Sequence, residues 1–411
     1  MPGLRKIADF VALKRSMVAM LAMVILVGMG ERMAERFLPI YLMALGGGAI
    51  TIGLLGGLQN LLGALYSFPG GYLSDRIGVK RSLLIFNLMA MTGFVIVILI
   101  PSVYAVLVGA FFFLAWSAIS LPATMGLVAS VLPSNKRTMG VSMHSLARRV
   151  PMSLGPVLGG LFIGAWGEVQ GVRLAFAAAL AMALVAAIMQ QVFIEPDRIR
   201  THSPGALKAE KNPFKLWHLM NSDMKNLLVS DILIRFCEQI PYAFVVVWAM
   251  KTVSSPVTAV EFGVLTAVEM ATAVLCYIPV AYWADKTAKK PFVVITFVFF
   301  TVFPLILLFS HSFWPLILAF FIRGLKEFGE PTRKALIMDL APRGREAAVF
   351  GLYYLIRDTI VAVAAFGGSL LWLLSPATNF ATAFVFGLIG TIWFIYRGKD
   401  ISNNTSSAGA K

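Results

Sequence analysis

Long apolar runs make up most of this chain, and short polar segments separate them. A helix needs about 20 mainly apolar residues to cross the hydrocarbon core of a bilayer. Helices are favoured over a barrel because the runs are continuous and because a helix pairs its own backbone polar groups. The pattern therefore predicts twelve spanning helices, which begin near Ser16, Ala49, Ser82, Val103, Val141, Arg173, Asn226, Thr258, Pro291, Phe313, Ala347 and Phe380.

The composition also indicates a membrane protein. Of the 411 residues, 59% are hydrophobic and 13% are charged, whereas soluble domains carry about 25% charged residues. The net charge of +15 does not indicate nucleic-acid binding, because the bases gather in short loops between apolar runs. We expect an all-α, multi-pass membrane protein whose partners include the lipid bilayer and exclude nucleic acid.

The basic loops predict the orientation of the chain. Loops such as ALGGGAI and SPATN hold almost no lysine or arginine, and they alternate with basic loops. The bases of the second set are Arg5, Lys6, Arg76, Lys80, Arg81, Lys136, Arg137, Lys286, Lys289, Lys290, Arg343, Arg345, Arg397 and Lys399. Because basic loops stay in the cytoplasm, we expect both termini there, in a bacterial inner membrane.

The chain also contains an internal repeat. Asp75 and Asp285 are 210 residues apart, and four further pairs share this offset: Pro69 and Pro279, Tyr72 and Tyr282, Gly53 and Gly263, Gln59 and Glu269. Other matches join Pro122-x10-Pro133 with Pro331-x10-Pro342, Arg149 with Arg357, and Gly159-Gly160 with Gly367-Gly368. Repeats of this kind are typical of secondary transporters. We expect two pseudo-symmetric six-helix bundles, 1–194 and 226–400, joined by a cytoplasmic linker, 195–225, and followed by a cytoplasmic tail, 401–411.

Two charged segments interrupt the apolar pattern at matching places: GYLSDRIGVKR at 71–81 and AYWADKTAKK at 281–290. The first resembles the Gly-x-Leu-x-Asp-Arg-x-Gly-x-Lys loop between the second and third helices of the major facilitator superfamily. This resemblance covers nearly the whole chain and implies the major facilitator fold of 12 transmembrane helices. PMSLGPVLGG at 151–160 resembles a Gly-Pro-x-x-Gly-Gly motif of exporters in that family, but it departs from it at Pro151. The fourth span lacks the arginine that many proton-coupled members carry there.

The charged segments are candidates for a gate. A carboxylate at a helix end can face the positive N-terminus of another helix or a base from another loop. Such pairs would lock one half of the chain against the other. The candidate gating residues are Asp75, Arg76, Lys80, Arg81 and Asp285. In the alternative interpretation these charges only enforce topology, and the second copy is expected to be the more structural one.

Ionisable residues inside the spans carry the functional information. Such a group near the bilayer centre costs at least about 2.5 kcal/mol, so it normally faces a wet cavity or a charged partner. They occur in the first span (Glu31, Arg32, Glu35, Arg36), the fifth (His144, Arg148, Arg149), the seventh (Arg235, Glu238), the eighth (Glu269) and the eleventh (Arg357, Asp358).

The tenth span, FFIRGLKEFGEPTRKALIMDLAP, is the most highly charged. Its spacing of four residues predicts intrahelical ion pairs between Arg323 and Glu327, Lys326 and Glu330, and Glu330 and Lys334. Pro331 is expected to interrupt the helix, because proline lacks an amide hydrogen. Arg333 and Lys334 are expected to extend towards the cytoplasmic surface.

The resemblance and the charges together suggest roles. In the family, the first, fourth, seventh and tenth helices line a central cavity. This implies cavity positions for Glu31, Arg32, Glu35, Arg36, Arg235, Glu238, Arg323 and Glu327. A buried carboxylate beside an arginine can exchange a proton for a solute charge. The leading proton-site candidates are Glu35, Glu238 and Glu269, and Arg32, Arg36, Arg235 and Arg323 are candidates for holding an anionic or zwitterionic group. Alternatively, part of this set, which also includes Arg357 and Asp358, forms structural ion pairs.

The function expected from the sequence is secondary active transport of a small polar or charged solute by alternating access, coupled to protons, with efflux favoured by the exporter-like motif. Proton-driven uptake of an organic anion or metal chelate is one alternative, and a transporter-like membrane sensor is another. An enzyme is not expected, because His144, His202, His218 and His311 are dispersed and join no catalytic motif. Cys237 and Cys276 lie in apolar runs without metal-ligand spacing, so no cofactor or metal is expected. The protein is expected to be a monomer.

Overall fold

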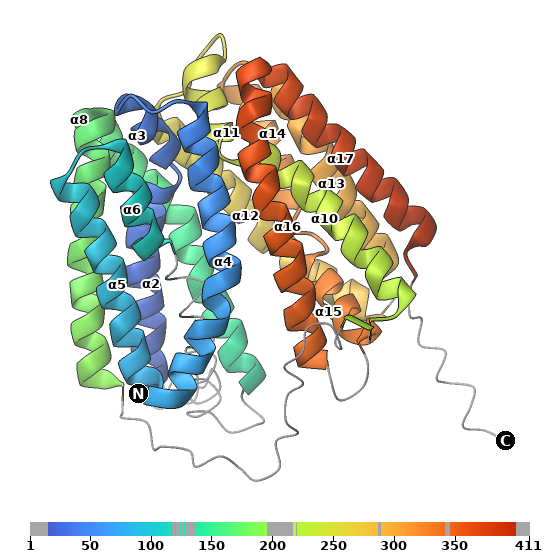
Figure 1. The fold of residues 1–411 in the computed structure, drawn as a ribbon, viewed down its shortest axis with the longest axis horizontal. Helices are drawn as coiled ribbons and strands as arrows, with labels where there is room; N and C mark the ends of the chain where they lie inside the picture. The colour runs from blue at the N-terminus through green and yellow to red at the C-terminus, as the bar shows by residue number, and fades with distance from the viewer. Residues whose placement is uncertain are drawn as a thin grey trace, which may run out of the picture. The chain divides into compact units, whose positions relative to one another are not determined.

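A computed structural model describes residues 15–114, 116, 120, 124, 127, 137–194, 217–218, 220–286, 289–341 and 346–399. Every regular element in this part of the chain is a helix (Figure 1). The contacts between residues divide the chain into two compact units. Unit 1 comprises Met1–Ser203 with Val257–Ala267, and unit 2 comprises Pro204–Pro256 with Val268–Lys411.

Unit 1 is built mainly from antiparallel helices, blue to green in Figure 1. They are α2 (Arg15–Glu35), α3 (Leu38–Ala44), α4 (Ala49–Ile77), α5 (Val79–Leu99), α6 (Val103–Phe113) and α8 (Arg137–Phe193). α8 reverses at Gly167, whose φ of 78° lies in the left-handed region that favours glycine. After the reversal, Gly171 lies directly against the backbone of Ile163. The two arms of α8 are therefore the fifth and sixth predicted spans.

Unit 2 continues from yellow-green to red in Figure 1. Its helices are α10 (Ser222–Tyr242), α11 (Val245–Val247), the π-helix η2 (Trp248–Thr252), most of α12 (Ala259–Lys286), α13 (Lys290–Leu308), α14 (Phe313–Leu325), α15 (Glu330–Leu340), α16 (Glu346–Leu374) and α17 (Pro376–Arg397). A core of buried side chains, with Phe297, Tyr353 and Phe394 among the largest, joins α10, α13, α15, α16 and α17.

Short polar residues fix where several helices begin. The side chains of Ser102, Asn221 and Ser375 accept hydrogen bonds from the backbone N–H groups three residues later, at 3.1, 2.8 and 2.9 Å. These bonds satisfy donors that have no partner within the helix itself. The sequence therefore marks the start of α6, α10 and α17 locally.

The twelve predicted spans agree with the helices. Seven of the described helices are long and apolar enough to cross a membrane, and the bent pair Ser222–Tyr242 and Val245–Thr252 makes an eighth. One of these spans, Ala147–Phe193 in α8, contains two predicted spans. The remaining three predicted spans correspond to the shorter apolar helices Ala49–Gly63, Val103–Phe113 and Phe313–Leu325. The all-α membrane fold expected from the sequence is confirmed.

The internal repeat is visible in the helix boundaries. α4 and α12 begin at Ala49 and Ala259, and α6 and α14 begin at Val103 and Phe313. Both pairs are 210 residues apart, the offset that separates Asp75 from Asp285. The predicted domain boundaries remain predictions, because most of the linker and the whole tail lie outside the described residues.

The two units also repeat one close contact between helices. A Cβ atom on Gly159 would meet the backbone carbonyl of Met33, and one on Gly368 would meet the backbone carbonyl of Ile240. Each glycine therefore lets its helix approach the first helix of its own unit. By these contacts Gly159 corresponds to Gly368. The sequence alignment instead pairs Gly159 with Gly367, which is one position away.

Candidate functional site

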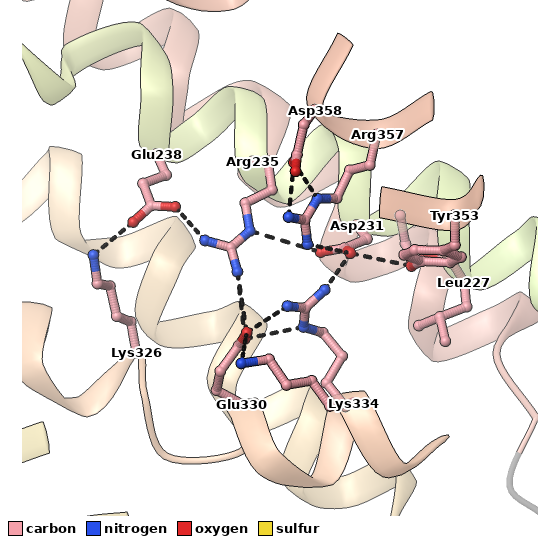
Figure 2. A network of polar contacts seen from close by, with 12 residues as sticks. Leu227, Asp231, Arg235, Glu238, Lys326, Glu330, Lys334, Tyr353, Arg357 and Asp358 are labelled. Atoms are coloured by element: carbon pink, nitrogen blue, oxygen red, sulfur yellow. Dashed lines mark hydrogen bonds and ion pairs between the residues drawn. The ribbon is translucent and has the colours of Figure 1, made fainter. Parts of the chain in front are cut away.

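A network of buried ion pairs lies inside unit 2 (Figure 2). Asp231 of α10 is its centre: it forms an ion pair with Arg333 of α15. Arg357 of α16 lies 3.3 Å from the same carboxylate oxygen, and the Tyr353 hydroxyl donates a hydrogen bond to it at 3.1 Å. A buried charge costs several kcal/mol unless it is paired, so these contacts connect three helices through one carboxylate.

Glu330, the first residue of α15, extends the network back to α10. Its carboxylate accepts hydrogen bonds from Arg333 at 2.6 and 3.0 Å. Arg235 of α10 approaches it at 3.4 Å and Lys334 at 3.5 Å. Glu330 therefore meets three bases, only two of which belong to its own helix.

A second chain of contacts leads from α10 to α12 and α14. Arg235 donates to one oxygen of Glu238 at 2.6 Å, and the Lys326 ammonium donates to the other at 2.6 Å. The same ammonium lies 3.8 Å from Glu269, which Arg323 approaches at 3.3 Å. Two carboxylates from different helices thus share one lysine.

Aromatic rings surround the bases of this second chain. The Phe300 ring lies 5.3 Å from the guanidinium of Arg235 and 5.6 Å from the ammonium of Lys326. The guanidinium of Arg323 lies 5.2–5.5 Å from the rings of Tyr242, Phe303 and Phe320. Ring faces attract cations most strongly where water is excluded, so these rings help to hold the bases in an apolar interior.

A break in the tenth span explains why one predicted pair, Lys326 with Glu330, does not form. α14 ends at Leu325 and α15 begins at Glu330, and the Gly329 N–H donates to the side chain of Thr296 at 2.5 Å. The helical spacing therefore does not carry Lys326 to Glu330, and the lysine contacts Glu238 and Glu269 instead. The predicted pair of Glu330 with Lys334 does form.

The expected surface position is wrong for one residue of this span. The side chain of Lys334 is 48% exposed, as the sequence suggested, whereas that of Arg333 is 1% exposed. The two neighbours point in different directions from α15, and of the two only Arg333 reaches Asp231.

The charged residues of the first span belong to unit 1. Arg32 pairs with Glu35 at 2.6 Å, and Gln59 of α4 donates a hydrogen bond to Glu35. Glu31 is buried, and Arg36 lies in the turn between α2 and α3. A Cβ atom on Gly155 of the PMSLGPVLGG motif would meet Arg32. The motif therefore brings α8 close against the charged part of α2.

The structure describes the side chains of only some of the candidate gating residues. The side chains of Asp75 and Asp285 lie outside the described residues, and Arg76 and Arg81 are exposed. Lys80 donates to the Gln191 carbonyl of α8 at 2.7 Å. Lys290, its counterpart at the 210-residue offset, donates to the Ile395 carbonyl of α17 at 2.8 Å. Each lysine therefore contacts a helix of its own unit, α8 for Lys80 and α17 for Lys290.

Most of the candidate residues in unit 2 therefore belong to one network. The unit 2 network contains Arg235, Glu238, Glu269, Arg323, Arg357 and Asp358, the last of which pairs with Arg357 at 2.7 Å. Glu327 lies beside Lys326 in the turn.

Two residues of the network were not singled out from the sequence. Asp231 could have been found, because it is an acid in an apolar run, four residues before Arg235. Tyr353 carries no such signal in the sequence. Among the described residues, no group of three or more histidine, cysteine or acidic side chains is placed to hold a metal ion.

Comparison with known proteins gives the following matches. The family model of the Major Facilitator Superfamily matches residues 20–250 and 227–410. A crystal structure of peptide transporter POT in complex with sulfate is similar with a TM-score of 0.76, at 13% identity over 93% of this chain and 94% of that one. A bacterial homolog of the human lysosomal transporter Spinster, inward-facing and unoccupied, has a TM-score of 0.68 at 14% identity over 94% and 98%.

A nucleoside transporter, NupG, has a TM-score of 0.76 at 11% identity over 93% of this chain and 100% of that one. At these identities the likeness concerns the fold. No curated protein matches the chain in sequence.

Proposed function

The chain belongs to the Major Facilitator Superfamily, and from this premise we propose that it transports a small polar or charged solute by alternating access, coupled to protons. It is an integral, multi-pass membrane protein of a transporter family. The proposal further places it in a bacterial inner membrane as a monomer with both termini in the cytoplasm.

The unit 2 network is the observation that carries the proposal. It joins the carboxylates of Asp231, Glu238, Glu269, Glu330 and Asp358 to six bases, namely Arg235, Arg323, Lys326, Arg333, Lys334 and Arg357. Such groups are expensive inside a membrane protein and normally mark solute or proton pathways. A lipophilic solute would require far fewer charges, which favours a polar or charged one.

Arg235 is the best-placed base for an anionic group. Its side chain is 19% exposed, whereas the other arginines of the network are more deeply buried. Its contacts are uneven: it lies 2.6 Å from Glu238 but 3.4 Å from Glu330 and 3.9 Å from Asp231. A solute carboxylate or phosphate could take over the weaker contacts, since a guanidinium binds such groups through two parallel hydrogen bonds.

Solved transporters of this fold support an anionic or zwitterionic solute in a general way. One is a complex with sulfate and another is a complex with 5-aminolevulinic acid. Because those chains are 13% identical to this one, the residues of the unit 2 network are the stronger support.

Proton coupling is assigned to Glu238 and Glu269. A carboxylate that loses a neighbouring base in an apolar interior takes up a proton more readily. Both acids share Lys326, and each has one arginine of its own. A solute anion that draws Arg235 away from Glu238 would therefore promote protonation of that acid.

A binding screen followed by a transport assay tests this function. Purified protein is heated with a panel of dipeptides, amino acids, nucleosides, organic anions and metal chelates, because a ligand raises the unfolding temperature by mass action. Each binder is then tested for counterflow in proteoliposomes. We expect one binder to show counterflow, and Arg235→Lys to weaken its binding about tenfold or more because the two-pronged contact is lost. Binding without counterflow would favour the sensor, and an uncharged lipophilic binder would contradict the substrate class.

Uptake and efflux are distinguished by measuring solute movement in the same vesicles under an imposed pH gradient. The exporter-like motif supports efflux only weakly, because Gly155 and Gly159 are explained by the packing of α8 against α2. Proton-driven uptake of an organic anion or a metal chelate is the second candidate, supported by the exposed edge of Arg235.

A further inference from the structure

We infer that Lys326 is an exchange cation, which moves between Glu238 and Glu269 during the transport cycle. Its ammonium lies 2.6 Å from Glu238 and 3.8 Å from Glu269. The first distance is a strong, charge-assisted hydrogen bond and the second is too long for one. A displacement of about one ångström would reverse this order. The inference rests on the proposed function, in which it adds the group that connects the two coupling acids.

The position of Lys326 in the chain suits such a movement. It is the first residue of the turn between α14 and α15, so its backbone lies outside both helices. Gly324 lies near the end of α14 and Gly329 is the last residue of the turn, and each lies against a neighbouring backbone, at Glu269 and Phe292 respectively. The glycines hold the turn close to α12 and α13, while the flexible four-carbon stem lets the ammonium move.

The chemistry of the residue also fits exchange better than fixed pairing. An ammonium is a compact charge with three donors, whereas a guanidinium is a rigid fork that fixes one geometry. At the centre of the network, the bases that meet Asp231 most closely are the guanidinium groups of Arg333 and Arg357. Lys326 instead places a single ammonium between the carboxylates of Glu238 and Glu269.

Several charged groups surround Lys326 and set the direction of exchange. They are Glu238 and Arg235 on α10, Glu269 on α12, Arg323 on α14, and Glu327 and Glu330 around the turn. Protonation of Glu238 removes the attraction that holds the ammonium there and leaves Glu269 as its remaining close carboxylate. Because Glu238 belongs to α10 and Glu269 to α12, the exchange changes which helix is tied to the α14–α15 turn.

A cycle of variants of the full-length purified protein tests the exchange without any solute. The coupling between Lys326 and Glu269 is measured as the non-additivity of the changes in unfolding temperature for Lys326→Met and Glu269→Gln. It is measured again in the Glu238→Gln background. If the ammonium moves, the coupling rises about twofold or more once Glu238 is neutral. An unchanged or smaller coupling overturns the inference.

Glu330→Gln is the matched control background, because it neutralises a network carboxylate for which the nearest bases are Arg235, Arg333 and Lys334. There the coupling between Lys326 and Glu269 is expected to stay the same, and an equal rise in both backgrounds contradicts exchange. Should Lys326→Met fail to fold, Lys326→Gln serves in the same cycle, because it also removes the charge but keeps a polar side chain.

Transport assays distinguish an exchange role of Lys326 from a purely structural one. With a solute found in the screen, Lys326→Arg is expected to lower proton-driven uptake about tenfold while counterflow, which needs no net proton movement, changes little. Equal loss of both overturns the inference, as does wild-type behaviour in both. If the wild-type protein shows no counterflow with any solute, the proposed function fails, and the variant cycle still decides the behaviour of Lys326.

Discussion

Arg333 and Asp231 form an ion pair between positions 102 residues apart, and both side chains are 1% exposed. The pair ties α15 to α10, and Tyr353 and Arg357 bring α16 to the same carboxylate. A buried pair of this kind adds little to stability in itself, but the loss of one partner leaves a buried charge uncompensated.

We therefore expect Arg333→Met to lower the free energy of unfolding by about 3–5 kcal/mol. Lys334→Met is the matched control on the adjacent position, because the Lys334 side chain is 48% exposed and its 3.5 Å contact with Glu330 is worth at most about 1 kcal/mol. Thermal or denaturant unfolding in detergent measures both. Similar effects of the two variants would show that Arg333 is not the buried member of the network.

Glu238→Gln and Glu269→Gln are expected to abolish proton-driven uptake in vesicles while counterflow persists, because an amide cannot take up and release the coupling proton. Uptake under an imposed pH gradient and a pH-sensitive dye inside the vesicles provide the two readouts. Glu168→Gln, at the turn of α8 in unit 1, should behave like the wild-type protein in both. Full driven uptake in both network variants would remove the two acids from the mechanism.

Gly368→Ala is expected to destabilise the protein by about 1–3 kcal/mol, because the new methyl group would meet the backbone of α10. A methyl group on the adjacent Gly367 would meet no atom within 4 Å, so Gly367→Ala should be neutral or stabilise the helix by up to about 1 kcal/mol. Gly159→Ala should reproduce the loss in unit 1. Comparable unfolding temperatures for the two neighbouring variants would contradict the close contact.

Lys80→Met is expected to lower stability by about 0.5–1.5 kcal/mol, the net value of one hydrogen bond, and to leave counterflow unchanged. The physical reason is that Lys80 contacts the Gln191 carbonyl inside unit 1. Lys290→Met, with the corresponding bond to Ile395, should show the same small loss. A marked change in counterflow with Lys80→Met alone would instead support the gating role that the sequence suggests.

The sequence by itself determined the membrane fold, the twelve spans and the repeat. These follow from properties that each segment carries locally: the length of an apolar run, the polar residue that caps a helix, and the 210-residue offset between matching positions. The sequence also showed that the spans contain costly charges. Glu238, Glu269, Arg235 and Arg323 are recognisable because an ionisable residue in an apolar run is conspicuous without any structure.

Only the tertiary structure decided which charges meet. Spacing along a helix predicts partners three or four residues away, as it did for Glu330 and Lys334, and it fails where the helix breaks. Lys326 contacts acids on α10 and α12 because the chain turns at 326–329. Arg333 is buried for a similar reason: the face of α15 that it occupies is covered by α10 and α16. Ion pairs between helices depend on distances across the bundle, which no local pattern contains.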